Sequence, residues 1–155
     1  MAGTTVARAG LIQSWGTTTT DLSGSGYPNE RHTPAAVALP GGVRATAIAA
    51  GATNFVAIGS DHYLYAWGMN SHGEIGDGTT TERPKPVRVK LPAGVKPVSI
   101  AAGAAETLMA GSDGRLYAWG DNSTGGLGTG KSNAVITTPT PVRLPAGVRA
   151  VAMSA

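Results

Sequence analysis

The sequence predicts an all-β protein made of three stacked repeats of about 52 residues. All three tryptophans are followed by glycine, and the pairs that begin at Trp15, Trp67 and Trp119 lie 52 residues apart. A Pro-x-Gly-Val element also recurs once per unit, at intervals of 52 and then 53 residues. A fixed period near fifty residues is typical of stacked supersecondary units rather than of one irregular domain. No stretch has the apolar periodicity of a convincing helix.

The third unit has the clearest pattern of strands. Val95 to Ala102 has an apolar rhythm and predicts a first strand, Glu106 to Gly111 a second, and Leu116 to Trp119 a third. A glycine-rich loop follows at Asn122 to Gly130, and Thr140 to Leu144 is expected to form the outer strand. Prolines before and within this last segment cannot donate ladder hydrogen bonds, so it should lie at the edge of its sheet.

The second and third strands of each unit are expected to be joined by a tight hairpin. In the third unit the turn is Ser112-Asp113-Gly114-Arg115, in which glycine can take a positive φ. The position of Gly114 is held by Gly10 in the first unit and by His62 in the second. We therefore expect His62 to have a positive φ, the alternative being a differently built turn.

Several longer strings recur as well. Ile100 to Ala104, Ser112 to Gly114, Leu116 to Asn122 and Gly126 to Gly128 together resemble the regulator of chromosome condensation repeat. The resemblance extends over essentially the whole chain. It implies a β-propeller with blades of four antiparallel strands, in a family whose rings commonly have seven blades. The first unit departs most, because Thr17 to Asp21 replaces the Asn-Ser-x-Gly sequence of the other two, and its loop is expected to differ in shape.

Each tryptophan lies in a predicted strand and occurs once per unit, which favours packing between blades over an open binding platform. A tyrosine two residues earlier in two of the units shares the strand face of the tryptophan. The residues predicted to pack the blades are Trp15, Trp67, Trp119, Tyr65 and Tyr117.

Three blades are too few for a closed ring, because propellers typically need four to eight. The expected units, about 1–50, 51–102 and 103–155, form a single repeat domain that is cut within a blade. The first unit then lacks its first strand, and Val148 to Ala155 forms such a strand without a blade. We expect head-to-tail strand exchange, most simply a homodimer with six blades. The alternatives are a segment of a longer chain with further repeats and, less simply, a trimer with nine blades.

Composition excludes several classes of protein. The chain has no cysteine, so disulfides and thiol catalysis are ruled out. Neither a signal peptide nor a run of about 20 apolar residues is present, so a cytoplasmic protein without a membrane segment is expected. The net charge of +3 is too small to indicate nucleic acid as a partner.

Catalytic, metal and cofactor sites are not expected. His62 is predicted in a hairpin turn and His32 in the divergent first loop, so neither suggests a catalytic triad. The segment from Asn70 to Asp77 fits neither a zinc nor a calcium motif. The glycine-rich run at 125–130 leads to a predicted strand instead of a helix, which argues against a nucleotide site.

Protein recognition is the function that the resemblance implies, since family members bind partners through the rims and loops of the ring. Some members act as exchange factors for small GTPases or bind chromatin, and some bacterial relatives inhibit β-lactamases. The exchange activity depends on a projecting element for which these units have no comparable insertion. We therefore expect a non-enzymatic interaction scaffold, with enzyme regulation by an inhibitor or exchange factor as the alternative.

Two surfaces are candidates for a partner. The long loops 17–35, 69–83 and 121–138 vary between units, and variable loops on a rigid scaffold often carry recognition. Their candidate residues are Asn70, His72, Glu74, Asp121 and Asn122. A basic stretch without an intervening acid could bind phosphate or an acidic partner, although an alternating, solvated edge strand explains it as well. It consists of Arg83, Lys85, Arg88, Lys90 and Lys96.

Overall fold

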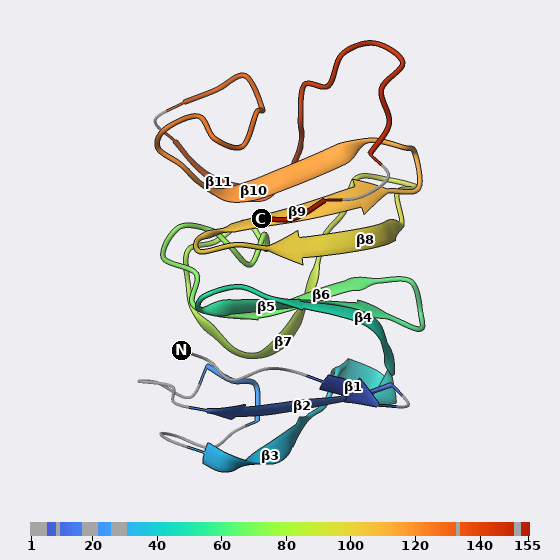
Figure 1. Cartoon of the computed structure of the whole chain (residues 1–155), viewed down its shortest axis with the longest axis vertical. Coiled ribbons are helices and arrows are strands. Elements are labelled where there is room, and N and C mark those ends of the chain that lie inside the picture. Colours follow the sequence, from blue (N-terminus) through green and yellow to red (C-terminus); the bar gives the residue numbers. More distant parts are fainter. Residues whose placement is uncertain (1–5, 9, 17–21, 26–30, 133, 151–152) are drawn as a thin grey trace.

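A computed structural model describes residues 6–8, 10–16, 22–25, 31–132, 134–150 and 153–155. These residues form three antiparallel sheets, which are stacked along the long axis of the molecule (Figure 1). In this part of the chain the one helical element is a 3-10 turn at Pro40–Gly42. The expectation of an all-β repeat fold is therefore confirmed.

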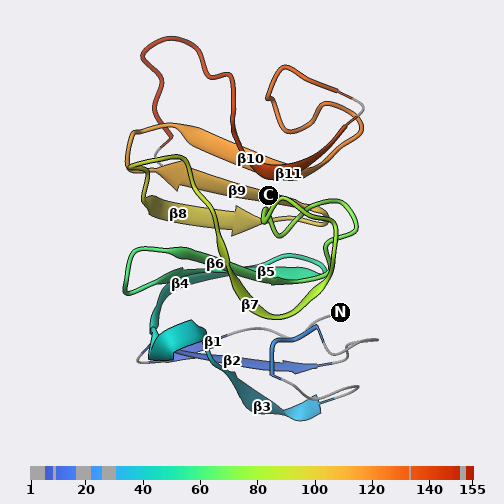
Figure 2. The same ribbon diagram turned by 180° about the vertical axis from the view of Figure 1, so that it is seen from behind.

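Strands that follow one another in the sequence pair side by side, so each sheet is a meander. The first sheet contains β1 (Val6–Arg8), β2 (Leu11–Gly16) and β3 (Arg31–Val37). The second contains β4 (Ala45–Ala50), β5 (Asn54–Gly59), β6 (Leu64–Gly68) and β7 (Arg83–Val89). The third contains β8 (Pro97–Ala102), β9 (Glu106–Gly111), β10 (Leu116–Asn122) and β11 (Ala134–Pro141). Figure 2 shows the stack from behind, with β7 crossing in front of its sheet.

The outer strand of the third unit lies earlier in the sequence than predicted. It is β11, which runs from Ala134 to Pro141, so the prediction of a strand from Thr140 to Leu144 was wrong. The amide of Val142 still donates to the carbonyl oxygen of Leu116 in β10, whereas that of Arg143 donates to the carbonyl oxygen of Gly128, so the chain leaves the ladder after Val142. The strand is nevertheless at the edge of its sheet, as its prolines predict.

The middle sheet is buried on both faces, which explains why β5 and β6 are buried at every position. Alternate residues of β5 belong to different clusters. Phe55 packs with the first sheet, in a cluster that includes Ile12, and Val56 packs with the third, in a cluster that includes Met109. Because side chains alternate across a strand, the central sheet joins the two neighbours through two separate apolar layers.

The hairpin turns match the prediction. His62 has a φ of 64°, beside values of 78° at Gly10 and 77° at Gly114. Within the described residues it is the one non-glycine side chain with a positive φ. The alignment of the three units is confirmed at this position.

Residues 148–150 and 153–155 are not part of a strand, although Val148 to Ala155 was expected to form one. Their path still follows the repeat. A Cβ placed on Gly114 would meet the Arg149 side chain, as one placed on Gly10 would meet the equivalent Arg44. A Cβ on Gly103 would lie 3.2 Å from that of Ala155. The described residues of this segment therefore lie where the two ends of the first strand of a following blade would be.

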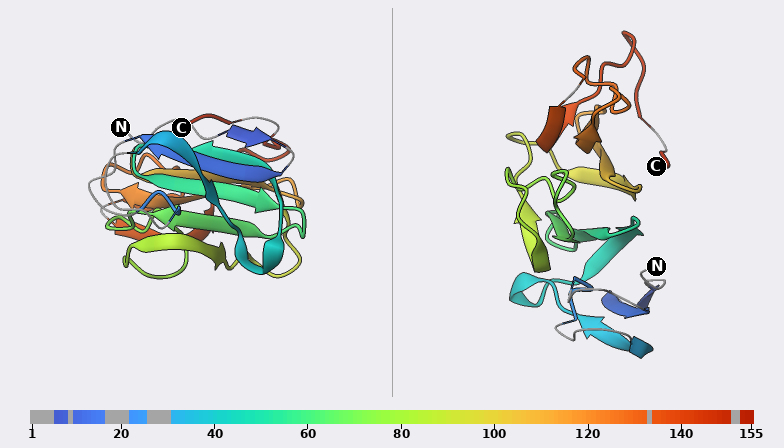
Figure 3. Two further views of the ribbon diagram at one scale, coloured as in Figure 1. Left: turned by 90° about the horizontal axis from the view of Figure 1, so that it is seen from below. Right: turned by 90° about the vertical axis from the view of Figure 1, so that its left-hand side faces the viewer.

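The sheets fan along an arc rather than stacking in parallel (Figure 3, right). The first strands β4 and β8 and the C-terminal end lie on one side of this arc, whereas the last strands β7 and β11 lie on the other.

Candidate interaction surfaces

The loops divide between two rims of the stack. The loop face carries the connections after the first and third strands of each sheet, at 51–53, 69–82, 103–105 and 123–132. The turn face carries the hairpins and the links between sheets, at 38–44, 60–63, 90–96, 112–115 and 142–150. In Figure 1 the loop face is the left edge and the turn face is the right edge.

Tryptophan joins each complete sheet to the unit before it. Trp67 and Trp119 are fully buried. The Trp67 indole nitrogen donates to the carbonyl oxygen of Ser23 at 3.1 Å, and that of Trp119 to the carbonyl oxygen of Glu74 at 2.8 Å. Trp15 is only partly buried, because its face of β2 points away from the second sheet.

The tyrosines lie beside the tryptophans, as the strand pattern indicated. Tyr65 and Tyr117 are buried, and their hydroxyls donate to Asp61 at 2.7 Å and Asp113 at 2.8 Å in the adjacent hairpin turns. Burial, followed by the bond to Asp61, raises the pKa of Tyr65 to about 12. These side chains fix the hairpins to the blades and are not exposed to a partner.

Two asparagines hold the long loops in shape. The Asn70 side chain accepts from the amide of Ile75 at 2.9 Å and donates to the carbonyl oxygens of Thr79 and Thr81, both at 3.0 Å. Asn122 makes the corresponding bond to the amide of Leu127 in the next unit. Both asparagines are buried. Their side chains are therefore structural and do not form part of an open binding surface.

Glu74 is also buried, with 2% of its side chain exposed, so it offers little to a partner. Its carboxylate accepts from the amide of His72 at 2.8 Å and lies 3.7 Å from the His72 ring. Half of the His72 side chain is exposed. Of the five loop residues predicted for recognition, only His72 and Asp121 reach the surface.

These two residues line the same hollow on the loop face, between the loops of the second and third units. The other walls are Ser123, Ala134 and Val135. Hydrogen bonds from Ser123 lower the pKa of Asp121 below its ordinary value, and the nearby His72 adds a smaller effect. The hollow therefore presents a carboxylate, an imidazole and an apolar wall, which suits a protein side chain with both polar and apolar groups.

The five basic residues do not form one patch. Arg83 is paired with Asp77 at 2.6 Å and also donates to Thr79, so it belongs to the loop. Lys85 lines a hollow beside the first unit, whereas Arg88 and Lys90 line another hollow beside the third. Lys96 is exposed before β8. The five residues are close in sequence, but Arg83 begins β7 and Lys90 follows its end, so these two lie a full strand length apart.

The structure brings no three potential metal ligands together among the residues it describes. His32 lies in β3, not in a loop as predicted. No helix in the described part of the chain has the length and apolarity needed to cross a membrane.

A model of the regulator of chromosome condensation (RCC1) repeat matches residues 61–109 and 113–155. A second RCC1 repeat model matches residues 45–74 and 98–125. The chain belongs to the RCC1 repeat family. Its sheets are therefore blades of an RCC1-type β-propeller, as the sequence predicted.

Relatives of this RCC1-repeat chain are much longer. The ultraviolet-B receptor UVR8 of Arabidopsis thaliana is 34% identical over 125 residues, which cover 81% of this chain and 28% of the receptor. The human E3 ubiquitin-protein ligase HERC2 is 30% identical over 138 residues, or 85% of this chain and 3% of the ligase. The chain thus spans less than a third of either relative.

Three solved structures share the fold. Human WBSCR16 matches with a TM-score of 0.78 at 19% identity, over 90% of this chain and 35% of that one. Yeast RCC1 (Prp20), solved with Kap60, matches with a TM-score of 0.76 at 24% identity, over 88% and 34% of the two chains. Prp20p of Saccharomyces cerevisiae, solved in a study of its binding to Gsp1p and histones, matches with a TM-score of 0.71 at 25% identity, over 88% and 35%.

Sequence reasoning missed two residues that line the hollows, Ser123 on the loop face and Tyr63 on the turn face. For Tyr63 the available signal was variation between units. Tyr63 corresponds to Leu11 in the first RCC1 repeat and to Arg115 in the third, so its position is not fixed by the fold.

Proposed function

We propose that this chain is a non-catalytic protein-interaction module. It completes a propeller by pairing head to tail with a second copy, as a homodimer with six blades. It binds a protein partner on the loop face, through the hollow lined by His72 and Asp121. The observation that supports this assembly is that the described blades at both ends of the stack each have one exposed face.

The first sheet supports the assembly. It has three strands, and no described strand pairs with the outer edge of β1. Leu11 of β2 is 61% exposed on the face that points away from the second sheet. An open strand edge beside an apolar side chain is typical of a surface that pairs with another chain.

The other end of the stack is complementary. Arg149 and Ala155 lie where the ends of a first strand would be, and the described strands of the first sheet do not include such a strand. Leu108 and Leu116 are partly exposed in the third sheet, whereas their counterparts Val56 and Leu64 are fully buried in the second. A second copy placed head to tail would cover both ends and close the ring by rotation.

The loop face supports partner binding. His72 lies on a loop that the buried Asn70 holds, and Asp121 lies in β10 next to the buried Asn122, so their positions are preorganised. Preorganised polar groups beside an apolar wall lose little conformational freedom on binding.

A capture experiment tests the partner-binding role. Tagged chain is used to isolate partners, and the double variant His72→Ala and Asp121→Ala is compared with Lys96→Ala, an exposed change on the turn face. We expect the double variant to lose a partner that the Lys96 variant keeps. Equal capture by both variants would place recognition elsewhere.

Regulation of an enzyme is the second candidate. It is favoured by the structural likeness to Prp20p, which is described with its binding to Gsp1p and histones. An activity assay on the captured partner separates the candidates. If the chain is a regulator, it changes the turnover or the nucleotide exchange of that partner. The double variant of His72 and Asp121 should leave both rates unchanged.

A further inference from the structure

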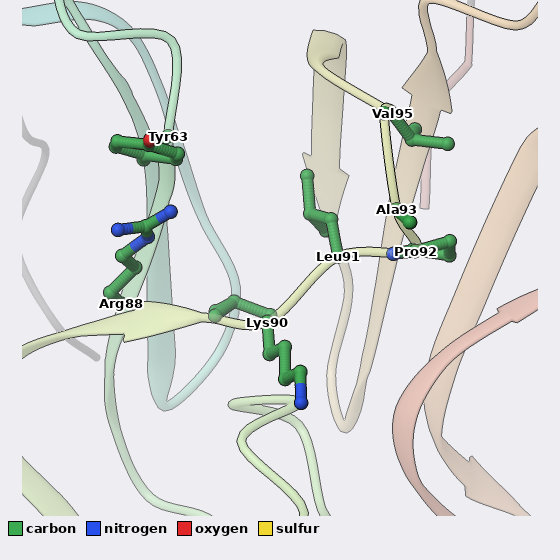
Figure 4. A pocket seen from close by; sticks show the side chains of 9 residues that line it. Tyr63, Arg88, Lys90, Leu91, Pro92, Ala93 and Val95 are labelled. Carbon is green, nitrogen blue, oxygen red and sulfur yellow. The ribbon is translucent and has the colours of Figure 1, made fainter.

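A second hollow, of about 390 Å³, lies on the turn face between the second and third units (Figure 4). Tyr63 and Arg88 form one side, and the link between the sheets at 91–95 forms the other. Lys90 lies between them, with its side chain extending away from Arg88 (Figure 4). The hollow therefore combines two cations with an apolar wall.

Arg88 is held in place by an aromatic ring. Its guanidinium carbon lies 3.1 Å from the centroid of the Tyr63 ring. The nearby Asp61 carboxylate accepts from the Tyr65 hydroxyl and the Tyr63 amide. None of the ion pairs between described residues includes Arg88 or Lys90. Stacking leaves the planar edge of a guanidinium free for a bidentate contact with a carboxylate.

The repeat provides an internal comparison. An equivalent hollow in the third unit is lined by Arg115, Pro141 and Leu144. Pro141 there takes the place of Arg88, and Arg115 that of Tyr63. The fold therefore builds the hollow without an arginine stacked on a tyrosine, and this pair is specific to the second unit.

We propose that this hollow binds an acidic, partly apolar peptide segment of a protein partner. A carboxylate of the segment pairs with Arg88, a second reaches the exposed Lys90, and an apolar side chain contacts Leu91 and Val95. The inference rests on the proposed binding role and adds a surface on the opposite rim. Its residues are separate from His72 and Asp121, so either surface can fail in experiment without the other.

Charge distribution favours a peptide over nucleic acid. Arg83 is neutralised by Asp77, and Lys85 lines a different hollow. Two cations beside apolar residues match alternating acidic and apolar side chains. A nucleic-acid backbone calls for a longer basic stripe.

Fluorescence anisotropy tests the proposal with a labelled peptide rich in Glu and Leu, a matched peptide with Gln in place of Glu, and a single-stranded oligonucleotide. We expect the Glu peptide to bind, and the pair of changes Arg88→Ala and Lys90→Ala to weaken it by about tenfold or more. Tyr63→Ala should weaken binding and Tyr63→Phe should retain it, because phenylalanine keeps the stacked ring. The matched control, Arg115→Ala with Arg143→Ala in the third unit, should bind as the unaltered chain does.

Four outcomes would overturn the proposal. They are no binding of the Glu peptide, equal binding of the Gln peptide, equal losses in both pairs of variants, and tighter binding of the oligonucleotide through the same residues. Circular dichroism of each variant separates loss of the site from loss of the fold.

Discussion

The Trp119 indole nitrogen and the Glu74 carbonyl oxygen form a 2.8 Å hydrogen bond between consecutive blades. The same carbonyl oxygen accepts from the Thr107 hydroxyl, also at 2.8 Å. Glu74 lies in the long loop of the second unit, so this loop is fastened to the blade that follows it. Trp67 fastens the loop of the first unit in the same way, through Ser23.

Replacing this tryptophan should loosen the contact between blades. Trp119→Phe removes the indole donor and part of a fully buried side chain. We expect the free energy of unfolding to fall by about 2–3 kcal/mol, from the lost hydrogen bond and the cavity. Urea unfolding measures the change. Tyr63→Phe, at a ring that is 43% exposed, is the control and should change stability by less than about 0.5 kcal/mol. Equal effects would contradict a special role for the interblade bond.

Thr107→Val should disrupt a buried polar connection without changing the volume greatly. The Thr107 hydroxyl donates to Glu74 and accepts from the Asn54 side-chain nitrogen at 3.1 Å. Valine leaves the buried Asn54 nitrogen unpaired, at an expected cost of about 1–3 kcal/mol. Adding Asn54→Ala should cost less in the Thr107→Val background than alone, because the two residues are coupled. Thermal unfolding of the double-mutant cycle measures this coupling, and strict additivity would refute it.

The loop of the second unit should lose stability in acid. Burial alone would raise the pKa of Asp77, but hydrogen bonds from Thr79 and Arg83 and the charge of Arg83 lower it below its ordinary value. A carboxylate with a lowered pKa stabilises the fold above its ordinary pKa of about 4, and the effect is lost as the pH falls further. Asp77→Asn should therefore reduce the melting temperature at pH 7, and the difference should shrink below about pH 4. A difference that stays constant from pH 7 to pH 3 would exclude this role of the charge.

His62→Gly should stabilise the second hairpin. His62 has a φ of 64°, where the equivalent turns have glycine. Glycine relieves the strain of this left-handed conformation, although the unfolded chain gains freedom, so we expect a net gain of about 0.5 kcal/mol. The reverse change, Gly114→Ala, should be destabilising by about 1 kcal/mol. Differential scanning calorimetry of both variants measures these changes in stability. A loss of stability in His62→Gly would show that the His62 conformation is not strained.

Much of the fold could be predicted because the repeat fixes equivalent positions. The hairpin of His62 and the strand from Glu106 to Gly111 both follow from alignment between units. The outer strand was misplaced because its register depends on tertiary pairing. Thr140 lies opposite Ala118, and the ladder shifts between Ala118 and Gly120. The local sequence gives no signal for this shift in register.

The candidate surfaces were harder to predict, because exposure depends on hydrogen bonds within the loops. Asn70 and His72 are two residues apart, yet one is buried and the other half exposed. Likewise, Arg88 and Tyr63 are far apart in sequence and meet only because β6 and β7 pair. Spacing along the chain could not distinguish Arg88 and Lys90, which form no ion pair with a described residue, from Arg83, which is paired with Asp77.

These three blades are expected to associate with a second copy. Light scattering after size-exclusion chromatography measures this association directly at micromolar concentration. We expect twice the chain mass of 15.5 kDa, and a shift toward the single mass in Leu11→Glu but not in Lys96→Glu, which changes an exposed side chain on the turn face. A stable particle of 15.5 kDa from the unaltered chain would contradict the account.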